Sequence, residues 1–428
     1  MKKITLLFWI AINSTLLPGQ INLIIEGTTV NNSIAGAWTG VNISRNQATQ
    51  FIYRNNSITS LNSSGYMLQA GDEAPLATNN NLDGEVITGN KFSWIGPNDP
   101  AIITHGVFTG YNVNSVVKYN YLQNVPYGII FKSGTDAGVN MTFTSGGCAY
   151  NVCKNGKFAA RLKGINGLKF YNNTFYSGDG TGLYLLLITS NTDRTIPAPS
   201  TGTKVFNNIF YSTRQIPMIQ LASGSLTNFE SDYNVFWCSA GEPIFNIDGA
   251  TVSWSQWRAR GYDAHSVIVD PDFINTTDFV PRTRLDYGTD LGTDWQTGLS
   301  TTATWVAGSA PGMTDQNGTW QVGARIYEGI NSPVTVPAVT VKMTVSPNHV
   351  HNIINIILEY SGSITTESNI ISPLIIRVKD ISGKLYLERP LVKGTANVRI
   401  PVNLKPGVYI VLLSAGGQVM NSQKIVAY

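Results

Sequence analysis

The chain has 428 residues, which is enough for more than one domain with a sizeable core. Its formal net charge is only +3 and charged residues make up 13% of it, which argues against a nucleic-acid-binding or membrane-surface protein. We therefore predict no nucleic-acid partner. A low charge content together with 41 Gly residues is typical of an extracellular β protein.

The N-terminus predicts an export signal. Met1, Lys2 and Lys3 form a basic start, and an apolar run from Ile4 to Ile12 follows that is too short to span a bilayer. We expect residues 1–20 to be a signal peptide that is removed on export. No other segment is apolar for long enough to suggest a membrane span, so the mature chain is predicted to have no transmembrane segment.

An internal repeat centred on asparagine covers the next two hundred residues or so. Its two most similar copies are Lys169–Tyr176 and Lys204–Tyr211. The copies recur at intervals of 22 to 35 residues, which indicates a repeat architecture. The seven copies are centred on Asn56, Asn90, Asn120, Asn151, Asn173, Asn208 and Asn234.

Other positions of the repeat support the same register. The residues two after, three before and eleven after each asparagine are apolar, with Ser231 as the exception. Apolar and polar residues alternate over short stretches, which favours short strands. We therefore predict β-coils stacked about 4.8 Å apart, with equivalent residues in columns along the axis. The inward asparagines would pass amide hydrogen bonds from coil to coil, so they are structural and not catalytic.

The cysteines are expected to be core residues. Cys148 and Cys153 fall in two of the apolar columns, and a disulfide between them would pull both out of the column. We predict no such disulfide, although three cysteines, with Cys238 as the third, are an odd number for an exported chain.

Beyond Asn246 the repeat ends. A Ser cap, two Trp residues three apart and a closing Gly predict a short helix within Ser253–Gly261. The stretch that follows, to about Tyr327, is expected to cover the open end of the solenoid. An acid/base cluster of His265, Asp270 and Asp272 is the alternative interpretation of this stretch, and capping is the one that we favour.

Residues 331–340 form a Pro/Val/Thr-rich linker before a last unit, residues 341–428. This unit has the alternation of a β-sandwich, and Asp380–Gly383 predicts a type I turn. Its motifs are Val345–Asn348, Val378–Lys384, Leu404–Tyr409 and Lys424–Val426. They resemble the C-terminal sorting domain of type IX secretion in Bacteroidetes. The resemblance implies an interaction with the type IX secretion machinery, followed by release or anchoring at the outer-membrane surface.

The body of the chain, residues 21–330, resembles the right-handed parallel β-helix proteins of the pectate-lyase-like superfamily. The repeats of the Tyr171–Phe175 type and the closing segment Asp270–Phe273 carry this resemblance. The expected fold is all-β: a right-handed single-stranded parallel β-helix followed by a small C-terminal β-sandwich. Because many members bind or cleave acidic polysaccharides along the coil face, the resemblance implies a polysaccharide as partner.

A basic cluster provides the candidate site. Lys132 and Lys163 both lie twelve residues after a repeat asparagine, so they should be neighbours on successive coils, and Arg161 should share their strand face. Repulsion among these charges would lower a lysine pKa, which suits a base that abstracts the proton beside a uronic carboxylate. Arg161 would neutralise that carboxylate.

This arrangement is similar to that of the β-helical alginate and chondroitin lyases, in which a lysine is the base and an arginine the acid. The motif Phe131–Ser133 agrees with theirs. Val125, Pro126 and Tyr127 stand where those enzymes have acidic calcium ligands, so the resemblance implies a metal-independent lyase with Lys132 and Arg161 as catalytic residues. We predict no metal site and no cofactor, although the sequence does not exclude calcium.

Lys163, Tyr127, His105 and Tyr121 are the candidate substrate-binding residues, since aromatic rings near the lysines could stack on sugars. The alternative is that the basic residues only keep an exposed sheet soluble and the rings only pack. A non-catalytic glycan-binding or adhesive surface protein is therefore the second functional hypothesis.

A glycoside hydrolase is the third hypothesis, because Asn191–Asp193 echoes part of a polygalacturonase motif. No paired carboxylates are found at matching positions of successive coils. The densest acids, Asp72, Glu73, Asp83 and Glu85, are explained by loop solvation or turns at least as well as by a calcium site.

Overall fold

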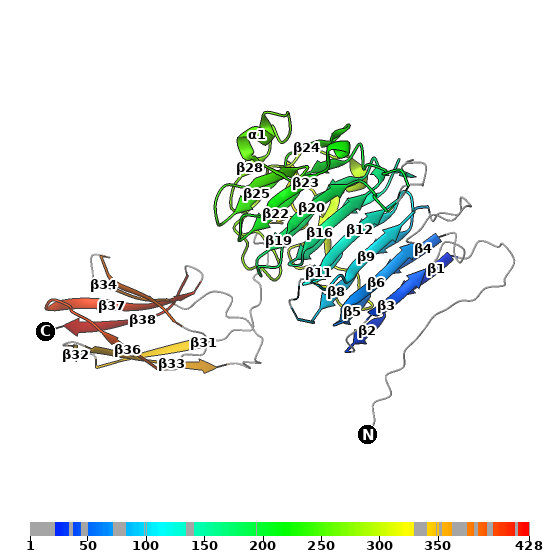
Figure 1. Ribbon diagram of the computed structural model, residues 1–428. Helices are drawn as coiled ribbons and strands as arrows, with labels where there is room; N and C mark the ends of the chain where they lie inside the picture. The colour runs from blue at the N-terminus through cyan, green and yellow to red at the C-terminus, as the bar shows by residue number, and fades with distance from the viewer. Residues whose placement is uncertain are drawn as a thin grey trace, which may run out of the picture. The chain divides into compact units, whose positions relative to one another are not determined.

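The computed structural model describes residues 22–33, 37–43, 50–71, 83–97, 99, 101–133, 141–193, 195–328, 340–347, 349–350, 353–361, 375–380, 384–391, 397–415 and 418–427. The chain divides into two compact units, residues 1–329 and 330–428 (Figure 1). The predicted signal peptide and the linker up to residue 339 lie outside the described residues. In the part of the chain that the structure describes, no helix is both long and apolar enough to cross a bilayer.

Three long parallel sheets form the first unit. The first sheet is β1 (Asn22–Glu26), β4 (Gln50–Arg54), β7 (Val86–Thr88), β10 (Val116–Lys118), β14 (Gly147–Ala149), β18 (Lys169–Tyr171), β21 (Lys204–Phe206) and β24 (Glu230–Asp232). The second is β2 (Thr29–Asn32), β5 (Ser57–Ser60), β8 (Lys91–Trp94), β11 (Tyr121–Gln123), β15 (Val152–Lys154), β19 (Thr174–Ser177), β22 (Ile209–Ser212), β25 (Val235–Cys238) and β28 (Val267–Ile268). The third is β3 (Ala37–Ile43), β6 (Ser64–Gly71), β9 (His105–Gly110), β12 (Tyr127–Lys132), β16 (Phe158–Lys163), β20 (Tyr184–Thr189), β23 (Pro217–Leu221), β26 (Ile244–Ile247) and the antiparallel β27 (Ala250–Ser253).

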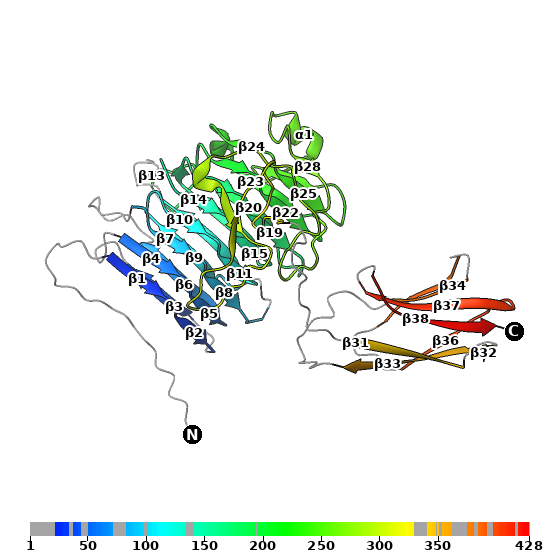
Figure 2. The same ribbon diagram turned by 180° about the vertical axis from the view of Figure 1, so that it is seen from behind.

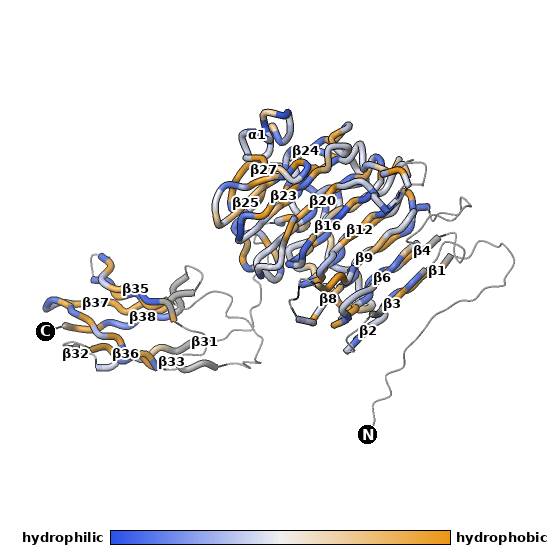
Figure 3. The backbone as a smooth tube through the Cα atoms, in the orientation of Figure 1, coloured by the Kyte–Doolittle hydropathy of each residue, from blue (hydrophilic) through white to orange (hydrophobic). Residues whose placement is uncertain are grey.

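Each coil contributes one strand to each sheet, which confirms the predicted parallel β-helix. Figure 1 shows the strands of the third sheet side by side in coil order, and the two views together show the coils stacked along one axis. Within the described residues, one coil, made of β1, β2 and β3, precedes the first repeat asparagine. Hydrophobic and hydrophilic positions alternate along the strands (Figure 3), as two-faced strands around a core require.

The repeat asparagines form the predicted ladder. The Nδ2 of each donates to the Oδ1 of the next at 2.9 to 3.1 Å, and the same Oδ1 accepts the backbone N–H of its predecessor. The second Nδ2 hydrogen is also used, since Asn90 donates to the carbonyl of Tyr53 at 2.9 Å. The ladder ends where Asn234 donates to Asp263 at 2.9 Å. The amides thus satisfy backbone groups that would otherwise be buried unpaired.

A left-handed residue precedes every ladder asparagine and makes the bend between the first and second sheets. The φ angles of these residues lie between 52° and 66°. Glycine and asparagine tolerate this region, whereas a bulky residue adopts it only when its surroundings hold it there. The residues are Asn55, Gly89, Tyr119, Tyr150, Asn172, Asn207 and Tyr233.

Two of the three predicted apolar columns are present throughout, and the third is only partly correct. The positions two after and three before the asparagines pair in register in successive coils. Among the residues eleven positions after an asparagine, only Phe131 and Leu162 pair with each other. Tyr184 pairs with Phe158 and not with Leu162. The cause is the connection between the second and third sheets, whose length differs from coil to coil and shifts the numbering.

The cysteine and helix predictions are confirmed. Cys148, Cys153 and Cys238 are buried free thiols. The helix α1 (Trp254–Arg258) begins at a capping box, in which the backbone N–H groups of Ser253 and Gln256 are each bonded by the other residue's side chain. Trp257 of α1 is fully buried, and its ring lies 4.4 Å from that of Phe245, so α1 closes the end of the core.

Only the first part of the stretch after α1 covers the end of the solenoid as expected, where β28 pairs with β25 and Asp263 accepts from Asn234. Residues 270–328, here called the return segment, run back along the flank of the β-helix (Figure 2). The Nε1 of Trp305 donates to the carbonyl of Tyr119 at 2.7 Å, and the N–H of Gly308 donates to the carbonyl of Asn55 at 2.9 Å. Tyrosines of the second sheet point outward at this flank, and the return segment buries them. Because these tyrosine rings would otherwise be exposed, the return segment runs along the flank instead of across the end of the solenoid.

Short elements complete the first unit: η1 (Ser223–Leu226), η2 (Thr293–Trp295), and the pairs β13 (Met141–Thr142) with β17 (Ile165–Asn166) and β29 (Thr297–Leu299) with β30 (Met313–Asp315).

The second unit is the predicted small β-sandwich, in which all strand pairs are antiparallel except that of β32 with β38. Side chains from both of its sheets share one core. Ile376 and Val378 are fully buried while Arg377 and Lys379 are not, which is the expected alternation. Residues 381–383 of the predicted turn lie outside the described residues. One sheet is β31 (Thr340–Ser346), β33 (Ile353–Ser361) and β36 (Asn397–Pro401), and the other is β32 (His349–Val350), β38 (Gln418–Ala427), β37 (Gly407–Ala415), β34 (Ile375–Asp380) and β35 (Leu385–Pro390).

Replacing a central ladder residue should destabilise the β-helix strongly. In Asn173→Ala the N–H and Nδ2 of Asn151 lose their acceptor, and the carbonyl of Cys148 and the Oδ1 of Asn208 each lose a donor. Each buried polar group left unpaired costs about 1–3 kcal/mol, so we expect a loss on the order of 4 kcal/mol in the free energy of unfolding. Urea denaturation followed by circular dichroism measures it. The control is the exposed Asn31→Ala, and equal stabilities of the two variants would contradict the role of the ladder.

Candidate functional site

The candidate site lies on the outer face of the third sheet, around strands β12 and β16. In these strands Ile129, Phe131 and Leu162 point into the core, so the residues between them point outward. Lys132 pairs directly with Lys163, which confirms that the two are neighbours in space. Arg161 stands two positions before Lys163 on the same face and pairs with Ile130.

A column of five aromatic rings crosses this face at the beginning of the strands. Successive ring centroids lie 4.8, 5.1, 4.9 and 5.9 Å apart. The sequence predicted only two members of this column, His105 and Tyr127. The others follow from the strand register, which the sequence did not give because the preceding connection varies in length. In coil order the column is Tyr66, His105, Tyr127, Phe158 and Tyr184.

An acidic residue that the sequence did not assign to this site joins the two lysines. The carboxylate of Asp193 lies 3.0 Å from the Nζ of Lys132 and 2.9 Å from the Nζ of Lys163. Asp193 comes from the loop after β20, and Asn191 fastens this loop by donating to the carbonyl of Ser133 at 2.5 Å. The lysine side chains are only 12% and 11% exposed, whereas Asp193 is 47% exposed. Asp193 therefore shields both ammonium groups on the solvent side.

This pairing changes the expected electrostatics. Hydrogen bonds from Lys163 and Lys132 lower the pKa of Asp193 to about 2. Burial lowers the pKa of Lys163, and the bond to Asp193 opposes that shift. Repulsion by Arg161 and Lys132 also lowers the pKa of Lys163, as predicted, and the shared carboxylate of Asp193 opposes this effect. The low pKa of Asp193 also removes it as a general acid for glycoside hydrolysis.

Arg161 forms no direct ion pair within the described residues, although the charge of Asp193 acts on it from a distance. Its guanidinium carbon lies 6.0 Å from the Phe158 ring, and its Nε is buried without a hydrogen-bond partner. Burial lowers the pKa of Arg161 from its usual value. Arg161 is half-buried, and a ligand with acceptor oxygens would offset the cost of burying part of its charge. Its planar donor array fits a carboxylate with two parallel hydrogen bonds.

His105 is neutral at physiological pH. Burial is the main cause that lowers its pKa to about 4. Repulsion by Arg161, Lys132 and Lys163 contributes to this shift, and a contact with the carbonyl of Gly65 opposes it. His105 thus belongs to the aromatic column as a ring and adds no positive charge to the face.

One predicted neighbour does not reach the site, and the alternative acid/base cluster, which the sequence did not favour, is not formed. Tyr121 does not reach this face, because it lies in the second sheet and is covered by the return segment, where its hydroxyl donates to the carbonyl of Thr277 at 3.1 Å. His265 does not contact Asp270 or Asp272. Instead its Nδ1 lies 2.6 Å from the carboxylate of Asp232, and its ring stacks on Tyr233.

The acids singled out in the sequence do not form a metal site among the described residues. No group of three or more His, Cys, Asp or Glu side chains in the described ranges is arranged to hold a metal ion. Asp83 is exposed and accepts from Asn114, and Glu85 is fully buried. Asp72 and Glu73 lie outside the described residues.

Comparisons with known proteins give no identity. No protein-family model matches the sequence, no match was found among the curated proteins, and none was found among the solved structures.

The buried Glu85 makes stability depend on pH. Asn112 donates to its Oε1 at 2.7 Å and Ser115 also donates to that oxygen, whereas Oε2 has no partner. Burial raises the pKa of Glu85 from 4.5 to about 7. Between these two values the folded chain holds a proton that the unfolded chain has released. The stabilising contribution is therefore complete below the unfolded pKa and is lost as the pH rises through about 7.

We expect the urea midpoint of the wild type to fall between about pH 5 and pH 8, with a slope from this group of up to about 1.4 kcal/mol per pH unit. Glu85→Gln keeps the group neutral and should flatten this part of the profile, so that the variant is more stable than the wild type at the higher pH. Identical slopes for the two proteins would contradict the assignment.

Proposed function

We propose that the chain is an extracellular protein that binds an acidic polysaccharide on the outer face of the third sheet. The observation that carries this proposal is Arg161, a partly buried guanidinium without a direct ion pair among the described residues, on the same face as two lysines. A uronic carboxylate would supply the missing acceptors. The half-buried tyrosines of the aromatic column offer hydroxyl groups and ring edges to the sugar beside it.

The location outside the cell rests on both ends of the chain. The N-terminal sequence is that of an export signal, and the second unit is a compact sandwich that carries the motifs of a type IX sorting domain. Leu404–Tyr409 leads into β37, and Lys424–Val426 lies in the last strand, β38. We therefore propose a secreted or outer-membrane-surface protein, delivered by the type IX machinery, whose first unit is a β-helix of the pectate-lyase-like kind.

A metal-independent lyase is the second candidate, and the adjacency of Lys132 and Arg161 on neighbouring strands favours it. Such a reaction needs a deprotonated base beside the carboxylate. Asp193 holds Lys132 at 3.0 Å and stabilises the ammonium form, so the loop would have to release the lysine first. Because binding needs no such release of Lys132, the structure favours binding over lysis.

Replacing Arg161 should weaken binding to acidic glycans. A hydrogen bond to a charged group contributes about 1.5–3 kcal/mol, so Arg161→Ala should raise the Kd for alginate, chondroitin sulfate or polygalacturonate by tenfold or more. Arg161→Lys keeps the charge but loses the planar donor array, so its Kd should lie between those of the wild type and Arg161→Ala. Titration calorimetry at fixed ionic strength measures the effect. Arg282→Ala, an exposed arginine of the return segment, is the control, and an unchanged Kd in Arg161→Ala would refute the proposal.

The lyase alternative is tested on the same polymers. Absorbance of unsaturated uronic products reports β-elimination, and we expect no such product from the wild type because its lysines remain paired with Asp193. Product that is retained in Lys204→Ala, a surface lysine paired with Glu230, but abolished in Lys132→Ala would instead establish the lyase.

A further inference from the structure

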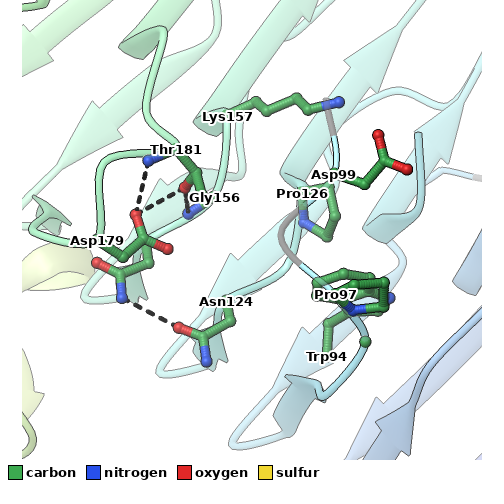
Figure 4. Close-up of a pocket in the computed structure, with 11 residues that line it drawn as sticks. Trp94, Pro97, Asp99, Asn124, Pro126, Gly156, Lys157, Asp179 and Thr181 are labelled. Carbon is green, nitrogen blue, oxygen red and sulfur yellow. Dashed lines mark hydrogen bonds between the residues drawn. The ribbon is translucent and has the colours of Figure 1, made fainter. Parts of the chain in front are cut away.

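A pocket of about 320 Å³ opens at the turn between the second and third sheets. Its volume is at the lower end of the range for small-molecule sites, about 300–1,000 Å³. Four successive coils line it, from Trp94 in the third coil to Asp179 in the sixth. Figure 4 shows Asp179 and Asp99 on opposite sides of this pocket, with Pro126 between them.

Its free polar groups suit a neutral hydroxyl-bearing ligand. One oxygen of Asp179 accepts from Thr181, and one oxygen of Asp99 accepts from the N–H of Ala101. The second oxygen of each carboxylate has no partner in the described part of the chain, and neither has the amide nitrogen of Asn124. Sugar hydroxyls donate to such carboxylates and accept from such an amide.

The charge of the pocket disfavours an acidic sugar. Two exposed carboxylates, Asp99 and Asp179, stand against one ammonium, that of Lys157. Lys157 is buried, and its Nζ donates to the carbonyl of Ile102 at 2.6 Å. A uronic carboxylate placed here would therefore face like charges.

The pocket is continuous with the face that carries Arg161. Pro126 and Lys157 line the pocket and directly precede Tyr127 and Phe158 of the aromatic column, and the Nζ of Lys157 lies 5.6 Å from the Tyr127 ring centroid. From Tyr127 to Lys132 the strand advances five residues, about 17 Å at the usual rise. A short oligosaccharide laid along β12 and β16 thus reaches from the acidic pocket to the basic cluster.

We infer that the pocket is a binding subsite for an uncharged sugar, so that the preferred ligand is a heteropolysaccharide in which uronic acids alternate with neutral or N-acetylated sugars. This inference rests on the proposed function and narrows its substrate class. A polymer that is acidic at every residue places a carboxylate in the pocket, whereas an alternating polymer places one beside Arg161 and hydroxyl groups between Asp99 and Asp179.

The full mature chain is titrated with chondroitin, which alternates, and with polygalacturonate, which is acidic throughout. We expect the wild type to bind chondroitin more tightly. Asp99→Ala combined with Asp179→Ala should weaken chondroitin binding about tenfold and leave polygalacturonate binding unchanged or stronger. The matched control combines Asp270→Ala and Asp290→Ala, two exposed aspartates of the return segment that also each bond the N–H two residues on.

Three outcomes overturn the inference alone. In the first, Arg161→Ala weakens binding of both polymers while the pocket variant binds chondroitin normally, and in the second the wild type prefers polygalacturonate. In the third, the pocket variant shows an equal loss on both polymers with a native circular dichroism spectrum, which overturns the discrimination proposed for the pocket. If Arg161→Ala changes neither Kd, or if the wild type binds neither polymer, the proposed function itself fails and this inference fails with it.

Discussion

The asparagine ladder is the constraint on which the first unit depends. Each coil bends sharply at a left-handed residue, and the bend buries backbone groups that no strand pairs. The asparagine side chain of the next coil bonds these groups, as Asn173 does when it accepts from the N–H of Asn151 and donates to the carbonyl of Cys148. Because each Oδ1 accepts two hydrogens from the coil before it, a shift of one residue breaks several bonds together. The ladder therefore fixes the register of the first and second sheets, and through β12 and β16 it brings Lys132 beside Lys163.

The sequence predicts the position of a residue well only when that residue is close in sequence to a ladder asparagine. Residues close to an asparagine, such as Phe175 and Phe210, are assigned correctly because only a few positions separate them from a fixed point. The third sheet is less predictable, since it follows a connection of variable length, and Tyr184 pairs with Phe158 instead of Leu162. The same variation hid most of the aromatic column. Tyr121 directly follows Asn120, and it was misplaced for another reason: no sequence signal showed that the return segment covers the outer face of the second sheet.

The sequence predicted the basic residues of the candidate site but not the carboxylate that pairs with the two lysines. The repeat places two lysines together, yet no periodic signal connects them with Asp193, which reaches them from a loop 30 residues beyond Lys163. Two partly buried ammonium groups on neighbouring strands need a counter-ion, so an acid nearby was to be expected on physical grounds. The sequence offers several acids and no means of choosing among them. The contrast between these paired lysines and the unpaired Arg161 is visible only in three dimensions.

The return segment changes how the β-helix responds to stress at its ends. In a solenoid whose units touch only their neighbours, terminal coils fray and separate one after another. Here the chain that leaves the last coil is hydrogen-bonded to Tyr119 in the fourth coil and to Asn55 in the second coil, near the opposite end. Unfolding of the N-terminal coils therefore also breaks their contacts with the return segment, which starts at the C-terminal end of the β-helix. The coils therefore behave as a single cooperative body, and its ends are less open to proteases, which cleave loosened segments first.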